Sequence, residues 1–303
     1  MVTRLDNIHG PVNLGRFADY LLEEMIVAKR PKHKHHIHIP VNSEGHPGIV
    51  SITAYHIDST GRAGFTVTPG VAPPEIGITG APESLPVISV EAAYSYNFRE
   101  LERAELSGIR VDSQKALIAG DAVEEQINKL AYLGAPDYSL YGLFSPTIPR
   151  IASSVNFNDP VLTVDEASNK LTDWATTVYN TLTNTAFQVD TVVMPPIMYT
   201  YMLKRRRSDH DSTTLMQAFR ESNPFITMVD ETPWASVAGP NGTPAMIFYT
   251  RDPSHLELHI PGGKLQQKII SQSEVNTSWL VFKDTAGVRI KQPSALIVEG
   301  FWH

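Results

Sequence analysis

Histidines and basic residues are concentrated in one short stretch, KRPKHKHHIH, which runs from Lys29 to His38. Four histidines within ten positions raise the question of a metal site, and a zinc site needs three or four ligands that converge on one point. In an extended chain, side chains alternate between two faces, which divides the four histidines two and two. The interspersed lysines and arginine also repel a cation. We therefore predict no metal site here.

The basic residues of this stretch form the first of two basic clusters. An arm that contacts phosphates or an acidic neighbour is one interpretation, and a solvated arm leading into a strand is the other. The second cluster, KRRR, is predicted to form the C-terminal end of a helix that runs through IMYTYMLKRRR, where cations interact favourably with the helix dipole. It is either a solvated helix end or a contact with an acidic patch of another subunit. The candidate inter-subunit or DNA-facing residues are Lys29, Arg30, Lys32, Lys34, Lys204, Arg205, Arg206 and Arg207.

No arrangement of residues predicts catalysis. The stretch SDHDS, from Ser208 to Ser212, contains serine, histidine and aspartate, but members of a catalytic triad converge from separate elements rather than from adjacent positions. Nucleophile-elbow, zinc-protease and phosphate-loop motifs are all missing. The neighbouring Glu124 and Glu125 point about 100° apart on a helix and cannot share one substrate. We predict no enzyme activity, no catalytic residue and no cofactor.

Composition excludes several other classes. The 303 residues contain no cysteine, so disulfides and thiolate chemistry are ruled out. No apolar run of 18 residues predicts a membrane span, and the N-terminus lacks the apolar core of a signal peptide. The formal net charge is −7, which disfavours a nucleic-acid-binding module as the function of the whole chain.

The elements that must position these clusters differ along the chain. The segment RFADYLLEEMIVAK predicts a helix within an N-terminal arm. From Pro40 to Pro86 there are seven glycines and seven prolines, and two alternating runs at 49–57 and 63–70 predict a long β-hairpin with a turn at DSTGRAG and an irregular return. A 47-residue segment without a helix is long for a connection inside a compact domain, so we expect it to project.

Helix signals follow the hairpin. Asn97 is placed to cap a short helix, and VDSQKALIAGDAVEEQINKLAYLG predicts a long helix, capped by Asp112 or Ser113, that ends at Gly134. Thr163 and Glu166 have capping-box spacing ahead of a third helix. A strand in FQVDTVVMPP precedes a helix that begins near Pro195 or Pro196, and another helix begins near Ser212 or Thr213. Strands are predicted at 225–229, 245–251, 256–260, 278–284, 287–291 and 294–302.

This order of elements resembles the major capsid proteins of tailed bacteriophages, which have the Hong Kong 97 fold. The resemblance is carried by the arm, the Gly/Pro-rich hairpin and three segments, which are 94–134, 164–203 and 284–302. It implies an α+β fold with an N-terminal arm (1–40), an extended β-hairpin loop (41–86), a peripheral domain with a long spine helix (87–140), a mainly axial domain (141–283) and strands that return to the peripheral domain (284–303).

The resemblance also implies a function. The expected protein self-assembles into pentamers and hexamers of an icosahedral shell around a phage genome, in a virion assembled in the host cytoplasm. Its partners are copies of itself, a portal, packaged DNA contacted non-specifically, and a separate scaffolding or decoration protein. Some members crosslink a loop lysine to a neighbour, but no lysine occurs from Val41 to Phe98, so we expect no such crosslink.

One further departure from the family and two alternative functions remain at this point. Only about 40 residues precede the hairpin, which is too short for the cleaved scaffolding region of many members, so a separate scaffold exists or none is needed. An encapsulin-type bacterial compartment shell shares the expected fold and is the nearest alternative. A soluble α/β enzyme with a concave pocket and perturbed titratable groups is the alternative from a different class.

Overall fold

The computed structural model describes residues 33–60, 77–100, 102, 111–208, 210–273, 275–292 and 294–302. The chain divides into two compact units. The first unit consists of Ser89–Asn128 and Gly263–Lys283, together with the residues up to Lys34. The second unit consists of His35–Ile88, Lys129–Gly262 and Asp284–His303.

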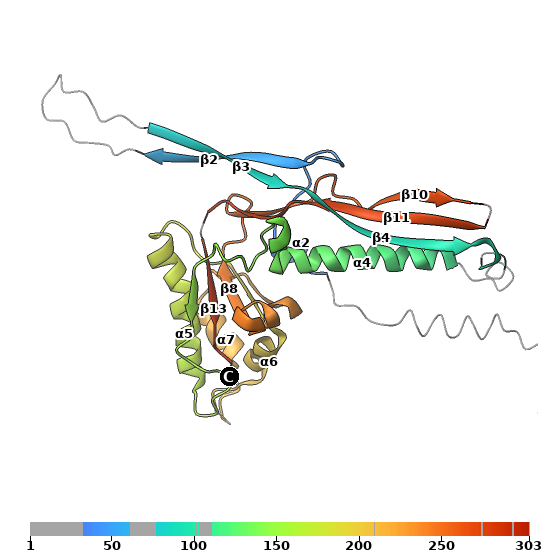
Figure 1. The fold of residues 1–303 in the computed structure, drawn as a ribbon. Coiled ribbons are helices and arrows are strands. Elements are labelled where there is room, and N and C mark those ends of the chain that lie inside the picture. The colour runs from blue at the N-terminus through green and yellow to red at the C-terminus, as the bar shows by residue number, and fades with distance from the viewer. Residues whose placement is uncertain are drawn as a thin grey trace, which may run out of the picture. The chain divides into compact units, whose positions relative to one another are not determined.

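The first unit pairs a long helix with a small sheet (Figure 1). Helix α4 (Val111–Leu133) is the predicted long helix and ends at Gly134, whose φ is +75°. Strands β4 (Ile88–Asn97), β10 (Gln266–Gln272) and β11 (Asn276–Thr285) form a three-stranded sheet in the order β10-β11-β4. The segment that leads into β10 contacts α4 at Gly120, where an added Cβ atom would lie 3.0 Å from the side chain of Leu265.

Charged side chains also join α4 to this sheet and to the segment after β4. Lys283 Nζ lies 2.6 Å from Glu124 Oε1, and the lysine is almost fully buried. Lys115 Nζ lies 2.6 Å from Glu100 Oε1 and 5.2 Å from the centre of the Tyr96 ring. Glu124 is thus part of an ion pair within the first unit.

The second unit is built on a five-stranded sheet in the order β5-β13-β8-β6-β7. Strand β13 (Ala295–Glu299) pairs parallel with β5 (Arg150–Ala152) and antiparallel with β8 (Ala245–Tyr249). Strand β6 (Thr191–Met194) pairs antiparallel with β8 and parallel with β7 (Met228–Glu231). The strands β6 and β8 are fully buried, which explains their continuous apolar sequences.

Three helices bury their apolar faces in one hydrophobic core with this sheet. Helix α5 (Val164–Thr177) begins with the predicted capping box of Thr163 and Glu166, and a π-helical turn, Val178–Leu182, continues it. Helix α6 (Pro196–Lys204) begins at the expected proline. Helix α7 (Leu215–Ser222) is capped by Thr214, slightly later than predicted, because Gln217 completes a second capping box there.

The hairpin differs from its prediction. Strand β2 (Ser51–Thr60) pairs antiparallel with β3 (Gly77–Pro86), with Ser51 opposite Pro86 and Thr60 opposite Gly77. The predicted second run, 63–70, lies outside the described residues, and the start of the predicted turn belongs to β2. The described part of the expected irregular return, Gly77–Pro86, is a strand instead. Prolines fit there because each strand of a two-stranded ribbon has one edge with no ladder bonds to lose.

The other elements are short or lie at the edge of the second unit. A three-stranded sheet has the order β1-β9-β12. Its strands and the remaining short elements are β1 (Val41–Asn42), β9 (Leu256–His259), β12 (Gly287–Ile290), α2 (His35–His38) and the short helices Pro136–Tyr138, Pro233–Val237 and Pro240–Gly242.

Several sequence predictions can be compared with these elements directly. The backbone N–H of Arg99 donates to the Asn97 side chain at 3.0 Å, as expected for a cap. Helix α4 begins at Val111, so Asp112 and Ser113 lie inside its first turn rather than ahead of it. Strands β4 and β10 were not predicted. The helix expected within RFADYLLEEMIVAK lies outside the described residues.

The compact units cut across the ranges expected from the sequence. Residues 263–283 group with α4 rather than with the rest of 141–283. Residues 284–303 group with 129–262, because β13 is an inner strand of the five-stranded sheet. Among the helices that the structure describes, none has the length and apolar character needed to cross a membrane.

Candidate inter-subunit surfaces

The histidine stretch is a helical turn in its described part and not the extended chain that the sequence predicted. The backbone N–H of Ile39 donates to the His35 carbonyl at 2.8 Å, which closes α2. The turn buries His35 and His38 and leaves His36 exposed. A helical turn forms here because helical spacing places the buried side chains at the two ends of α2 on the same side, toward the rest of the second unit.

His38 is fully buried in a polar network (0% exposed). Its Nδ1 lies 2.5 Å from the Tyr132 hydroxyl, and its Nε2 lies 3.0 Å from Asp230 Oδ2. The Tyr249 hydroxyl donates to the His38 carbonyl at 2.7 Å. Burial raises the pKa of both tyrosines, so both hydroxyls stay protonated. Both ring nitrogens of His38 thus contact protein groups, and the described residues contain no cluster of three or more side chains able to hold a metal ion.

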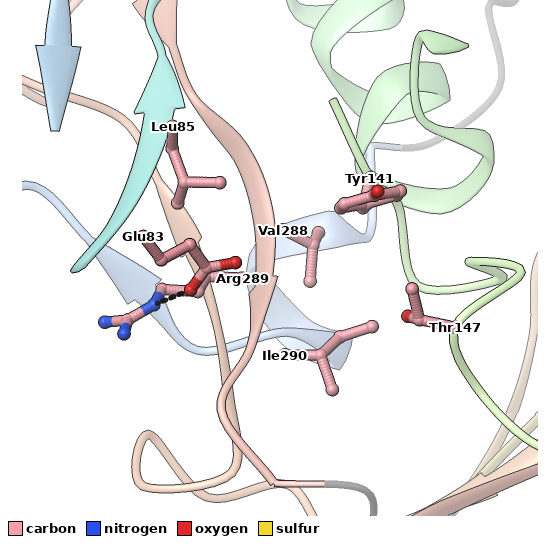
Figure 2. Close-up of a pocket in the computed structure, with 7 residues that line it drawn as sticks. All are labelled: Glu83, Leu85, Tyr141, Thr147, Val288, Arg289 and Ile290. Carbon is pink, nitrogen blue, oxygen red and sulfur yellow. Dashed lines mark hydrogen bonds and ion pairs between the residues drawn. The ribbon is translucent and has the colours of Figure 1, made fainter. Parts of the chain in front are cut away.

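Two contacts fix the root of the hairpin to the rest of the second unit, and a third joins its two strands. The N–H of Gly48 donates to Asp284 Oδ2 at 3.0 Å, and the N–H of Val87 donates to the Val50 carbonyl at 3.0 Å. Arg289 Nε, on β12, lies 3.2 Å from Glu83 Oε2, on β3, as Figure 2 shows. Arg289 is only 11% exposed, so this ion pair is partly shielded from solvent.

A small pocket lies behind this ion pair (Figure 2). It has a volume of about 200 Å³, and its walls are mostly apolar. The lining residues come from β3, the segment after α4 and β12, and are Glu83, Leu85, Tyr141, Thr147, Val288, Arg289 and Ile290. The pocket has no nucleophile with an activating base, so its shape and chemistry do not make an active site. The pocket lies between the root of the hairpin and β12.

A buried polar strip crosses the small sheet beside the root. Glu257 Oε1 lies 2.8 Å from Lys291 Nζ and 2.7 Å from His259 Nε2. Burial alone would raise the pKa of Glu257, but its contacts with Lys291 and His259 outweigh burial and lower it. Burial lowers the pKa of His259 despite the nearby carboxylate. The Glu257–Lys291 ion pair therefore links β9 to the segment after β12, whereas the Glu257–His259 contact lies within β9.

The second basic cluster splits into two pairs. Arg205 donates to the carbonyls of Pro160 and Leu162 at 3.0 and 2.8 Å. Arg207 lies 2.7 Å from Asp165 and 3.3 Å from Asp211. Lys204 and Arg206 are exposed, and no side chain that the structure describes contacts either of them. Arg205 and Arg207 are thus structural, which leaves two residues of the cluster available to a partner.

The first basic cluster lies largely outside the described residues. Lys29, Arg30 and Lys32 are among the undescribed residues, and Lys34 is half-buried and has a partner within the chain. The stretch SDHDS is a local turn, in which Asp211 pairs with Arg207 and the N–H of Asp211 donates to Ser208 Oγ at 3.0 Å. Its described residues form no triad.

Sequence analysis missed the partners of the buried groups. Tyr132 and Asp230 lie 94 and 192 positions away from His38. Glu83 lies 206 positions from Arg289. No local pattern marks such pairs, because each contact depends on the packing of elements that are distant in sequence.

The comparisons with known proteins agree with this fold. The sequence profile of the major capsid protein family matches residues 61–298, which is more than half of the chain. The capsid of Myoviridae phage XM1 has a similar structure, with a TM-score of 0.77 and 19% identity over 90% of this chain and 94% of that chain. No match was found among curated proteins.

Two further solved structures have the same fold at lower similarity. The capsid of the native GTA particle gives a TM-score of 0.65 and 11% identity, over 91% of this chain and 92% of that chain. A virus-like particle from Pyrococcus furiosus gives a TM-score of 0.53 and 14% identity, over 93% and 97%. With the Hong Kong 97 fold confirmed and the family profile matched over this length, the chain belongs to the major capsid protein family.

Proposed function

We propose that this major capsid protein assembles into pentamers and hexamers, which together form an icosahedral shell around a phage genome. The observation that carries the proposal is the family match over residues 61–298, supported by a fold shared with the phage XM1 capsid over most of both chains. The function is structural. It requires no catalytic residue, and the polar groups described above contribute ion pairs and hydrogen bonds to the fold.

In this proposal, each expected domain is assigned to elements that the structure describes. Residues 1–40 form the N-terminal arm, and 41–86 form the extended loop, whose root is held by Arg289. Helix α4 and the sheet β10-β11-β4 form the peripheral domain. The five-stranded sheet with α5, α6 and α7 forms the axial domain, and it includes β13 near the C-terminal end.

A two-stranded ribbon is marginal in water unless a further surface covers it. Strands β2 and β3 pair only with each other among the described strands. We propose that a neighbouring subunit supplies the missing surface, so that assembly stabilises the ribbon. This reasoning depends on the strand pairing and on general physical chemistry.

The remaining partners follow from the same proposal. A portal, a scaffolding or decoration protein and packaged DNA contact the shell, with the DNA held non-specifically. The side chains of Lys204 and Arg206 have no ion pair or hydrogen bond with a described residue, which makes them candidates for a contact with a neighbouring subunit. The shell is part of the virion and assembles in the host cytoplasm.

A bacterial compartment shell is the second candidate. It is favoured by the similarity to the virus-like particle from Pyrococcus furiosus, whose TM-score of 0.53 is lower than the 0.77 of the phage XM1 capsid. The two candidates differ in content, because a phage shell holds DNA and a compartment holds protein cargo.

Expression of the chain with and without the other capsid genes of its source tests the proposal. We expect rings or closed shells by negative-stain electron microscopy, and nuclease-protected DNA in particles formed in the complete system. Particles that enclose protein cargo and no DNA would instead support the compartment. A monodisperse monomer in both systems would contradict both candidates.

A further inference from the structure

Helix α6 carries an outward face for which the described chain provides no cover. Ile197 is 47% exposed and Leu203 is 48% exposed, although both are large apolar residues. Lys204 and Arg206 extend the same end of the helix with two positive charges that have no partner among the described side chains. An apolar helix face bordered by free cations is typical of a surface that docks into a groove.

A groove with the complementary character lies at the start of α5. Its volume is about 450 Å³, and Val155, Val161 and Leu162 supply its apolar lining. Val161 is 80% exposed, which is unusual for an apolar side chain at the wall of a groove. The charged lining residues are Asp159, Glu166, Asp173 and Lys170, so carboxylates outnumber cations three to one.

These two surfaces are not joined within one copy of the described chain. Arg205 and Arg207 bond to residues 160–165, next to the groove. The side chains of Lys204 and Arg206 are exposed and have no ion pair or hydrogen bond with a described residue. The two charges of the α6 face are therefore available to a second copy.

We propose that the α6 face of one copy docks into the α5 groove of a second copy, with Lys204 and Arg206 set against Asp159 and Asp173. The proposal rests on the self-assembly proposed above and assigns residues to one contact within a capsomer. Because the two surfaces differ, the contact is head-to-tail. Repeated head-to-tail contacts close into rings when the rotation between copies permits.

The charges of the α6 face and of the α5 groove favour a second copy over other occupants. The groove is acidic and repels nucleic-acid phosphates, while the α6 face is too apolar to be a simple phosphate contact. Apolar and charged parts match in both surfaces, and complementary charge fixes the register of an interface and suppresses wrong pairings. The same chain carries both surfaces, so no unknown protein has to be invoked.

Charge reversal tests the contact in the full chain. We would compare wild type with two charge-reversed variants. One changes the α6 face (Lys204→Glu and Arg206→Glu), and the other changes the groove (Asp159→Lys and Asp173→Lys). The four-substitution combination and a control, Lys268→Glu on the exposed strand β10, complete the set. Sedimentation velocity over a concentration series gives the concentration for half-maximal association. Each reversed variant should raise this concentration at least about tenfold, and the combination should return it to within about threefold of the wild-type value.

Several results would overturn the proposal. They are a reversed variant that associates as wild type does, a control that weakens association as much as the reversed variants, or a combination no better than its parents. If wild type itself forms no oligomer at any concentration, then the self-assembly proposal fails as well, so the two failures are distinguishable. Circular dichroism melting of each variant identifies any that fail to fold.

Crosslinking provides a test that does not depend on charge reversal. The chain contains no cysteine, so Arg206→Cys together with Asp173→Cys introduces the only two thiols. A head-to-tail contact predicts a ladder of covalent multimers after treatment with a short bismaleimide, extending to five or six chains. Either single-cysteine variant should give no ladder. The absence of multimers from the double variant in assembled material would overturn the proposal.

Discussion

Removal of one hydroxyl from the His38 network should loosen the segment that leads from the arm into the second unit. The Tyr132 hydroxyl lies 2.5 Å from His38 Nδ1, and both side chains are fully buried. Tyr132→Phe keeps the ring and deletes this contact. The loss of a hydrogen-bond partner for a buried polar atom costs about 1–3 kcal/mol.

This cost should appear as faster local opening. The N–H of Ile39 donates to the His35 carbonyl, and the N–H of Leu258 donates to the Pro40 carbonyl, both at 2.8 Å. If the segment opens by separating from Tyr132, then hydrogen exchange at these two amides should accelerate about 5- to 150-fold, which corresponds to 1–3 kcal/mol. Exchange in the core strand β6 should not change.

Hydrogen-exchange mass spectrometry on peptides that cover residues 35–42 and 256–260 measures this effect in the assembled protein. Tyr138→Phe is the matched control, because Tyr138 is 60% exposed and its hydroxyl contacts no described residue. Equal exchange in the two variants would refute the reasoning, since it would show that the buried hydroxyl contributes nothing to holding this segment.

Three further predictions concern single contacts. Thr214→Ala removes the capping box of α7 and should lower the free energy of unfolding by about 1 kcal/mol in urea titrations, whereas Thr214→Ser should preserve it. Arg289→Met breaks the ion pair with Glu83 and should increase proteolysis of the hairpin in unassembled protein. If the ion pair is the cause, then Glu83→Gln should increase proteolysis by no more than Arg289→Met does. Burial lowers the pKa of His255, so the unfolded chain binds a proton more readily and the free energy of unfolding should fall as pH drops below about 6.5. This part of the pH dependence should vanish in His255→Gln, and an unchanged pH profile would contradict it.

Local signals were sufficient for the N-terminal ends of α5 and α6. Thr163 and Glu166 cap α5 through each other, and Pro196 starts α6, because both effects act within one turn of chain. The apolar stripe of α5 also lies in the core as predicted. Such signals survive in any tertiary context, so the sequence alone located these helices.

Long-range pairing was beyond the reach of the sequence. Strand β3 pairs with β2 across the segment 61–76, but its two glycines and two prolines and its lack of apolar alternation favoured the nearer run at 63–70 as the predicted strand. Strand β10 is exposed and polar at most positions, so it lacks the apolar alternation that indicates a strand. Pairing depends on the partner as well as on the strand, and the partner is far away in sequence.

The basic clusters show the same limit at the level of single residues. The sequence placed Lys204 to Arg207 in one group, because their charges and positions are alike. In the structure, Arg205 bonds to the loop before α5, Arg207 pairs with Asp165 in the first turn of α5, and Lys204 and Arg206 are exposed. The separation arises because side chains alternate along the extended segment that follows α6, beside α5. A helix over the same residues, as predicted, would not have this alternation.

The central claim is that copies of this chain assemble into a shell. Negative-stain electron microscopy of the purified chain, with sedimentation velocity on the same sample, tests it most directly. The account predicts closed particles or rings of five and six subunits. A stable monomer or small oligomer that forms neither rings nor shells, even when the chain is produced with the other capsid genes of its source, would contradict it.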